Sequence, residues 1–308
     1  MNIIITGGLG YVGGRLSKYL AEQGHAVVAL SRQANNLTAM SWPAGMRVAH
    51  PDTYFQNPEW LKEFDVFIHL AALNEHDCVK FPEQAIEVNI TQTVQWLDSA
   101  YRAGIKQFIY FSTAHVYGKP LEGYYDEQSS TQPVHPYAIT HKCAEDYVLS
   151  YRAEKGMNNL VIRLTNSFGG PAFPTADRWT LLVNDLCRSA VETGTMTLQS
   201  DGLQLRDFIA LEDVCNAIIH LLSTPAEPGI FNVGAGHSIS VWDMALLVKQ
   251  RAEQYLQKSI GLSRKQPTAV VVPAQLHISI DRLLKTGFSP TLNTESEVDA
   301  TLQYFHSH

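Results

Sequence analysis

Short runs of apolar residues alternate with amphipathic segments through the first half of the chain. The runs lie at residues 3–5, 27–30, 66–70, 108–111 and 160–164. They are continuously apolar, which is typical of strands buried on both faces. Helical spacing separates them, as with Leu16 and Leu20 after the first run. We therefore expect a doubly wound parallel α/β sheet with right-handed connections and helices on both faces.

The pattern changes after about residue 168. Residues 169–180 carry glycines and prolines and are expected to be loop. Helical patterns follow near 180–192, 212–222 and 240–257, and the last fifty residues look irregular. We expect a larger domain over residues 1–168, completed by residues 208–237, and a smaller, mostly C-terminal lobe over residues 169–308.

The first predicted strand runs directly into a glycine-rich turn. Gly7, Gly10 and Gly13 recur at every third position, with Tyr11 and Val12 between the last two. Glycine permits a tight turn and a close backbone approach to a pyrophosphate, and the next helix presents free N–H groups and the positive end of its dipole. In this strand–turn–helix context the turn predicts a dinucleotide-binding Rossmann domain, with a merely structural turn as the alternative.

The end of the second predicted strand bears on the choice between NAD(H) and NADP(H). An acidic residue there would bond the ribose hydroxyls of NAD(H). This chain has Ser31 and Arg32 instead. A guanidinium can pair with a 2′-phosphate in a bidentate fork, so we favour NADP(H) over NAD(H) as cofactor. The alternative is an ordinary solvated arginine.

Charge and cysteine usage narrow the partners. The net charge is −7 and no long basic run occurs, which disfavours nucleic acid or an anionic membrane as the main partner and favours a small-molecule substrate. The apolar runs are far shorter than a membrane span. The four cysteines form no Cys-x-x-Cys pair and are expected to be reduced thiols in a cytoplasmic protein.

A metal site is not expected. The only tight group of metal-ligating residue types is His76-Asp77-Cys78, which we expect to lie in a loop. No second group has the i, i+4 spacing of ligands on a helix.

Motifs spread over nearly the whole chain carry a family resemblance. They lie at residues 6–13, 69–72, 89, 111–118, 136–138, 163–166, 206–208 and 231–236. Together, and in this order, they resemble the extended short-chain dehydrogenases/reductases, in the NAD-dependent epimerase/dehydratase group that includes UDP-galactose 4-epimerase. The resemblance implies a nucleotide-sugar enzyme and a homodimer formed by the helices near 83–103 and 137–154.

The resemblance also implies roles for single residues. Thr113 would bond the reacting hydroxyl or carbonyl, and Tyr137 would be the general acid/base. Asn166 and Arg206 would hold the substrate, with Arg206 on its diphosphate. The further cofactor contacts that the resemblance implies are Asp52 at the adenine and Leu70, Ala71 and Ala72 along the dinucleotide.

The chain departs from the family around the catalytic tyrosine. The family has lysine four residues after the tyrosine, but here His141 stands there and Lys142 follows. One step along a helix turns a side chain by about 100°, so Lys142 should point elsewhere. His141 could bond the nicotinamide ribose, but would give Tyr137 less positive charge near neutral pH.

Two more departures bear on the reaction. Ala114-His115 replaces the Asp-Glu of the dehydratase branch, which disfavours 4,6-dehydration. The Arg-Pro-x-Asp segment that helps to grip the nucleotide is absent from residues 270–275. We expect a 4-ketoreductase or 4-epimerase of a nucleotide-linked sugar. The alternatives are an NADPH-dependent reductase of a non-nucleotide carbonyl compound and a low-activity dinucleotide-binding sensor.

Overall fold

A computed structural model describes the chain except residues 38–40, 175, 177, 225–226, 267–273 and 308. Its main sheet has seven parallel strands. In spatial order they are β11(Gly229–Val233), β7(Asn159–Leu164), β5(Gln107–Thr113), β4(Val66–His69), β1(Asn2–Thr6), β2(Ala26–Leu30) and β3(Met46–Ala49). The expected doubly wound α/β fold is confirmed. The strand order reverses between β1 and β4, the place where such sheets open a crevice at their carboxyl ends.

Helices cover both faces of this sheet, which explains why apolar residues follow one another without alternation through most of its strands. Ile3 and Ile5 of β1 pack in the core on one face and Ile4 in the core on the other. The first face is covered by α1(Tyr11–Glu22) and α8(Leu211–Ser223), the second by α5(Gln92–Ala103) and α6(Pro136–Lys155). Short helices α2(Pro51–Gln56), α3(Glu75–Lys80) and α10(Asp281–Leu284) complete this part of the chain.

The expected helix near 83–103 is interrupted. It consists of α4(Pro82–Ile86), a π-helical turn over Glu87–Thr91, and α5. Asn89, in that turn, is buried; it accepts a hydrogen bond from the Leu73 amide and donates one to Thr140 on α6. Wider turns of this kind often occur at functional sites. Here the turn lets one side chain tie two helices to the loop after β4.

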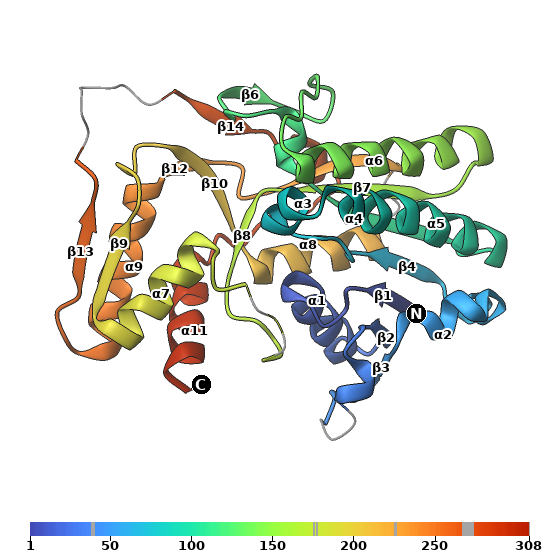
Figure 1. The fold of residues 1–308 in the computed structure, drawn as a ribbon, viewed down its shortest axis with the longest axis horizontal. Coiled ribbons are helices and arrows are strands. Elements are labelled where there is room, and N and C mark those ends of the chain that lie inside the picture. Colours follow the sequence, from blue (N-terminus) through green and yellow to red (C-terminus); the bar gives the residue numbers. More distant parts are fainter. Residues whose placement is uncertain (38–40, 175, 177, 225–226, 267–273, 308) are drawn as a thin grey trace.

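A smaller lobe lies beside the Rossmann sheet (Figure 1). Its helices are α7(Leu182–Thr193), α9(Val241–Leu256) and α11(Thr294–Ser307). Its strands are β8(Asn166–Phe168), β10(Leu205–Ala210), β12(Ser238–Ser240), β9(Thr195–Leu198) and β13(Gly261–Arg264). A further pair, β6(Gly123–Tyr125) and β14(Leu276–Ile278), is parallel. The carboxyl half of the chain therefore contributes to both parts of the structure, because β11 belongs to the main sheet.

The expectation that the last fifty residues are irregular was wrong. Helix α11 packs into the core of the smaller lobe, where Val298 and Leu302 are fully buried among side chains of α7 and α9. Pro290 lies before this helix rather than in it. None of the helices within the described residues is both long and apolar enough to cross a membrane.

Candidate active site

A cavity of about 800 Å³ opens at the carboxyl ends of β1, β2, β4 and β5 and continues to the segment after β7. All the site residues expected from the sequence line it. They are Gly7, Gly10, Tyr11, Val12, Gly13, Ser31, Arg32, Asp52, Leu70, Ala71, Ala72, Thr113, Tyr137, His141, Asn166 and Arg206. The structure therefore brings segments from both lobes to one site.

The glycine turn forms a cradle that a side chain would fill. Gly7 has a φ of +67°, in the left-handed region that favours glycine. A Cβ on Gly13 would lie 2.2 Å from the backbone oxygen of Gly7, so the turn closes only without a side chain there. The N-terminus of α1 follows at once, which suits a pyrophosphate. These residues fit a dinucleotide.

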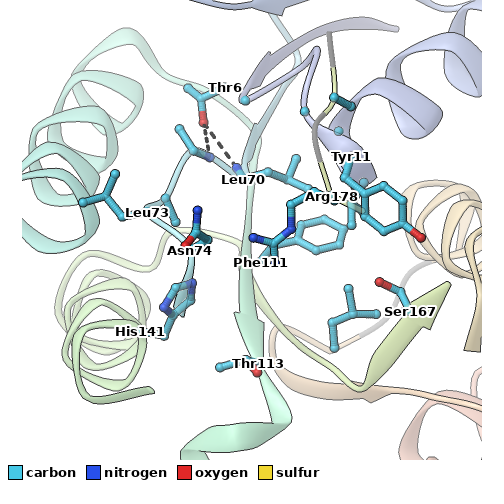
Figure 2. Close-up of a pocket in the computed structure, with 18 of the residues that line it drawn as sticks. Thr6, Tyr11, Leu70, Leu73, Asn74, Phe111, Thr113, His141, Ser167 and Arg178 are labelled. Carbon is cyan, nitrogen blue, oxygen red and sulfur yellow. Dashed lines mark hydrogen bonds between the residues drawn. The ribbon is translucent and has the colours of Figure 1, made fainter. Parts of the chain in front are cut away.

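A chain of buried hydrogen bonds holds the segment after β4 in place beside the glycine turn. The Thr6 hydroxyl accepts from the Leu70 and Ala71 amides at 3.2 and 3.3 Å (Figure 2). The same hydroxyl lies 2.6 Å from Nδ1 of His69, whose Nε2 is 2.9 Å from the Thr93 hydroxyl. Thr93 donates to the Asn89 carbonyl, so His69 must donate through Nε2 and accept through Nδ1 from Thr6.

His69 is thereby held neutral. Its complete burial, with a smaller contribution from His141, lowers its pKa to about 3. Sequence reasoning recognised His69 as part of a motif but gave no role to Thr6 or His69. The available signal was their position at the ends of two neighbouring strands, where side chains of a parallel sheet meet.

The wall beside the second strand carries charges of both signs. Arg32 is exposed, and no acidic side chain in the described part of the chain pairs with it. The Ser31 hydroxyl accepts from the Gln33 amide. The Asp52 carboxylate lies 3.4 Å from Nδ1 of His50, at the start of α2.

The expected catalytic pair meets across the cavity floor. Thr113 ends β5, and Tyr137 is the second residue of α6, whose first turn begins at Pro136 after the His135 cap. Thr113 and Tyr137 both line the cavity and lie close enough for the Thr113 hydroxyl to influence the pKa of the phenol. Burial raises the pKa of Tyr137 well above its ordinary value; Glu75 raises it further, and Arg178 and the Thr113 hydroxyl lower it.

One turn along α6, the two residues after Thr140 point in different directions. The buried His141 ring lies 4.2 Å from the Tyr137 ring, and its Nδ1 is 2.8 Å from the Tyr137 carbonyl. Burial lowers the pKa of His141 to about 4, so the ring is neutral at pH 7. Lys142 instead pairs with Asp146 on the outer side of the helix, as the helical rotation predicted.

The two residues expected to hold the substrate have few partners. Arg206 bonds only the Gln204 amide oxygen, at 3.0 and 3.3 Å, and no carboxylate among the described residues pairs with it. Burial lowers its pKa. Asn166 lines the cavity and its side-chain amide donates to the Asp207 carbonyl.

Among the charged or titratable residues of the cavity, Glu75, Arg178 and His115 were assigned no role from the sequence. Glu75 and Arg178 form an ion pair at 3.1 Å, and His115 lies just after Thr113. Arg178 belongs to a loop, where spacing carries no information about what a side chain meets. His115 was considered only because the dehydratase branch of the family has an acidic residue at this position.

The expectation that His76-Asp77-Cys78 lies in a loop was wrong. These residues form part of α3, and Cys78 is fully buried against the Leu73 carbonyl and Asn89. Across the described residues, no three acidic, histidine or cysteine side chains are placed to share a metal ion. The sequence lacks the family's Arg-Pro-x-Asp segment at residues 270–275. Of these residues, 270–273 lie outside the described part of the chain.

Residues 3–234 match the family model described as the NAD dependent epimerase/dehydratase family. The chain belongs to this family. It is similar to the low-salt glycan biosynthesis protein Agl12 of Haloferax volcanii, with 27% identity over 99% of this chain and 98% of the relative. A dTDP-D-glucose 4,6-dehydratase of Mus musculus is 24% identical over 98% and 88% of the two chains.

A solved structure has the same fold. The UDP-glucuronic acid 4-epimerase of Bacillus cereus, in complex with UDP-glucuronic acid and NAD, superposes with a TM-score of 0.82 at 22% identity, covering 100% of this chain and 99% of its own. Family membership makes this protein an enzyme of the NAD-dependent nucleotide-sugar epimerase/dehydratase type with an NAD(P) dinucleotide cofactor.

Proposed function

We propose that this enzyme moves hydride between NADP(H) and the 4-position of a nucleotide-linked sugar, as a 4-ketoreductase or a 4-epimerase. The observation that carries the proposal is the Thr113–Tyr137 pair, which faces the same cavity as the glycine cradle. A hydroxyl and a phenol on one reacting oxygen are what reversible oxidation of an alcohol requires.

In this proposal the bound nicotinamide supplies or accepts the hydride. Thr113 bonds the reacting oxygen and orients it. Tyr137 gives that oxygen a proton during reduction and takes one during oxidation. Burial raises the pKa of Tyr137 and so favours its protonated form, which is the form that gives the proton.

His141 is proposed to seat the nicotinamide ribose. The Tyr137 carbonyl can only accept, so the proton of the neutral His141 ring resides on Nδ1. Nε2 is then an acceptor, able to receive a hydrogen bond from a ribose hydroxyl. A lysine at this position could only donate, so this seat differs chemically from the one that the family resemblance implies.

A retained-ligand experiment separates the two reactions. Native mass spectrometry of gently purified protein should show an empty site that takes up NADPH if the enzyme is a reductase. A tightly retained dinucleotide would identify the epimerase, because an epimerase reuses its cofactor within one cycle. Binding without turnover of any 4-keto or 4-hydroxy nucleotide sugar would leave the sensor alternative.

The proposed preference for NADP(H) over NAD(H) rests on Arg32. The solved relative is in complex with NAD and does not support this preference. A charge-assisted bond to a 2′-phosphate contributes roughly 1.5–3 kcal/mol. In Arg32→Ala, NADPH affinity should therefore fall by about 10- to 100-fold while NADH affinity stays unchanged. Arg188→Ala is the matched control, because Arg188 pairs with Asp185 on α7 and does not line the cavity. Equal affinity of the wild-type protein for NADPH and NADH would contradict the preference.

The nucleotide part of the substrate is assigned to Arg206. Its guanidinium has no carboxylate partner among the described residues and faces the cavity, so a diphosphate would find it available. Calorimetry with UDP and dTDP should show weaker binding to Arg206→Ala and unchanged NADPH binding. If neither nucleotide binds wild-type protein at millimolar concentration, the reductase of a non-nucleotide carbonyl compound becomes the better assignment.

We also propose a homodimer. Large apolar side chains are exposed on and just before the helices that cover the second face of the sheet, α3 to α6. They are Val79, Phe81, Ile86, Tyr101, Ile139 and Tyr147. An isologous interface would bury the same patch on both copies. Light scattering at micromolar concentration should give the mass of two chains, and a monomer mass would refute the pairing.

A further inference from the structure

One histidine of the cavity has no part in the proposed hydride transfer. Three histidines in the described part of the chain line the cavity. The His50 ring accepts a hydrogen bond from the Asp52 amide. The His141 ring lies with its Nδ1 2.8 Å from the Tyr137 carbonyl. The ring of the third, His115, has no hydrogen bond or ion pair with any described residue, so both of its nitrogens are available to a ligand.

The turn after β5 places His115 beside the hydroxyl that would hold the reacting oxygen. Thr113 caps the 3₁₀ turn Ala114–Tyr117, and its hydroxyl accepts from the His115 amide at 3.2 Å. Ala114, between the two, is buried in an apolar cluster with Leu276 and Ile278, whereas His115 is exposed and lines the cavity. A substrate carbonyl group bonded to Thr113 would therefore bring its neighbouring carbons next to the His115 ring.

The other possible bases of the cavity are already engaged. The Glu75 carboxylate is paired with Arg178 at 3.1 Å. The Asp77 carboxylate accepts from the Asn74 side-chain amide at 2.8 Å. The Asp52 carboxylate lies beside a histidine at the start of α2, at the cofactor end. Among the described residues, the free proton acceptor closest in sequence and structure to the reacting oxygen is thus the imidazole that follows β5.

A ketone at the 4-position gives such an acceptor something to do. A hydrogen on a carbon next to a carbonyl group is acidic, because the electron pair left behind is delocalised onto the carbonyl oxygen. A neutral imidazole is a suitable base for it near pH 7. Burial lowers the pKa of His115 from its ordinary value, with a smaller opposite effect of Glu75, so the ring is neutral at that pH.

We propose that His115 is a general base that removes the proton from a carbon next to the 4-keto group of the bound sugar, C3 or C5, so that the enzyme enolises its keto sugar. The inference rests on the proposed function and deepens it, because it adds the breaking of a second C–H bond to the hydride transfer. Return of the proton to the other face of that carbon would invert a second centre of the sugar.

The step balances with the groups named. The C–H bond breaks, and its electron pair becomes the second bond between that carbon and the carbonyl carbon. The carbonyl π pair moves onto the oxygen, where Thr113 donates a hydrogen bond and the Tyr137 phenol supplies a proton. The proton from carbon goes to a ring nitrogen of His115. The product is an enol of unchanged oxidation state, so no oxidant or reductant is consumed, and the reverse steps restore the ketone.

Deuterium exchange measures this step without any net reaction. The probe is dTDP-4-keto-6-deoxyglucose, incubated with the full chain and NADP⁺ in D₂O and followed by proton NMR. Because His115 is exposed, its ring exchanges the captured proton with solvent, and the ketone regains deuterium. Wild-type protein should remove the C3 or C5 proton signal well above the rate without enzyme. His115→Gln should slow this loss by roughly 10²- to 10⁴-fold.

Two further variants make the result specific to a base at this position. His115→Glu, which restores a proton acceptor, should recover part of the exchange that His115→Gln loses. His76→Gln removes an exposed histidine from α3 that does not line the cavity, and it should exchange at the wild-type rate. No exchange by wild-type protein, or wild-type exchange by His115→Gln, would overturn the inference.

Reduction of the same ketone by NADPH, assayed in parallel, separates this inference from the proposed function. His115→Gln should lower exchange far more than reduction. Reduction without exchange would overturn the role of His115 alone. Exchange without reduction, and without any reaction of the dinucleotide, would overturn the proposed hydride transfer and leave the role of His115 standing. Absence of both would overturn both.

Discussion

The two ends of the cavity are built in different ways. At the cofactor end, the glycine turn of residues 6–13 and the strand end at residues 69–72 set the walls with backbone atoms, so that a Cβ at Gly13 would meet a backbone oxygen at 2.2 Å. At the reaction end, Thr113, Tyr137 and Arg178 bring side chains from three distant segments. Steric fit governs the first end and electrostatic environment governs the second.

That difference predicts different responses to substitution. Substitutions at the cofactor end should lower cofactor affinity and the stability of the fold together, because the same backbone atoms contribute to both. A reaction end made of side chains should lose turnover while the fold persists. The four predictions below test this contrast, from the largest expected effect to the smallest.

The largest effect should come from Tyr137→Phe. Removing one hydroxyl from the reaction end should lower turnover by roughly 10²- to 10⁴-fold, the contribution typical of a positioned acid or base. Thermal unfolding and NADPH titration should give nearly wild-type values, since the ring still packs on the cluster with Leu73 and Cys78. A comparable loss of cofactor affinity would show that the two ends are not separable.

Next, acid should destabilise the protein through two buried histidines, one at each end. Their folded pKa values are about 3 for His69 and about 4 for His141, below the ordinary value of 6.5. The unfolded chain therefore binds more protons as pH falls below about 6.5, and the stability present above that pH is lost towards pH 4. Each histidine should cost about 3 kcal/mol there.

Denaturant unfolding between pH 7 and pH 4 measures this loss. His69→Gln and His141→Gln should each flatten the pH dependence, whatever their stability at pH 7. Replacing an exposed histidine such as His76 should leave the slope unchanged. A wild-type slope in both variants would contradict the buried, neutral state of these rings.

Gly13→Ala should cost about 1–3 kcal/mol of stability, because the new methyl group must displace the Gly7 backbone. NADPH affinity should fall with it. Gly261→Ala in the smaller lobe is the control, since its nearest neighbour is the Thr195 methyl carbon at 3.1 Å, the end of a side chain. Unchanged NADPH binding in Gly13→Ala would show that the glycine turn is not part of the cofactor site.

The smallest effect should come from Lys142→Ala. Its ion pair with Asp146 is on the outer side of α6, where an i, i+4 pair contributes about 0.3–0.5 kcal/mol. Turnover should match wild type across pH. A large loss of activity, or a shift of the pH profile, would mean that Lys142 serves Tyr137 after all.

Much of the fold was predictable because its cause is local. Continuous apolar runs mark strands covered on two faces, and the runs expected at residues 3–5 and 66–70 fall on β1 and β4 of the sheet. The helix over α6 was also expected, within one residue at each end. Helix α11 was missed because the prolines before it carried more weight than the spacing of Val298 and Leu302.

The sequence by itself determined the strand–turn–helix that cradles a dinucleotide, since a turn that forbids side chains can be recognised in glycine spacing. It also determined that His141 and Lys142 point in different directions, because the rotation per residue of a helix is fixed. Only the tertiary structure decided which charges surround Tyr137. Glu75 and Arg178 are 103 residues apart along the chain, and electrostatic effects depend on distance and burial rather than on sequence separation.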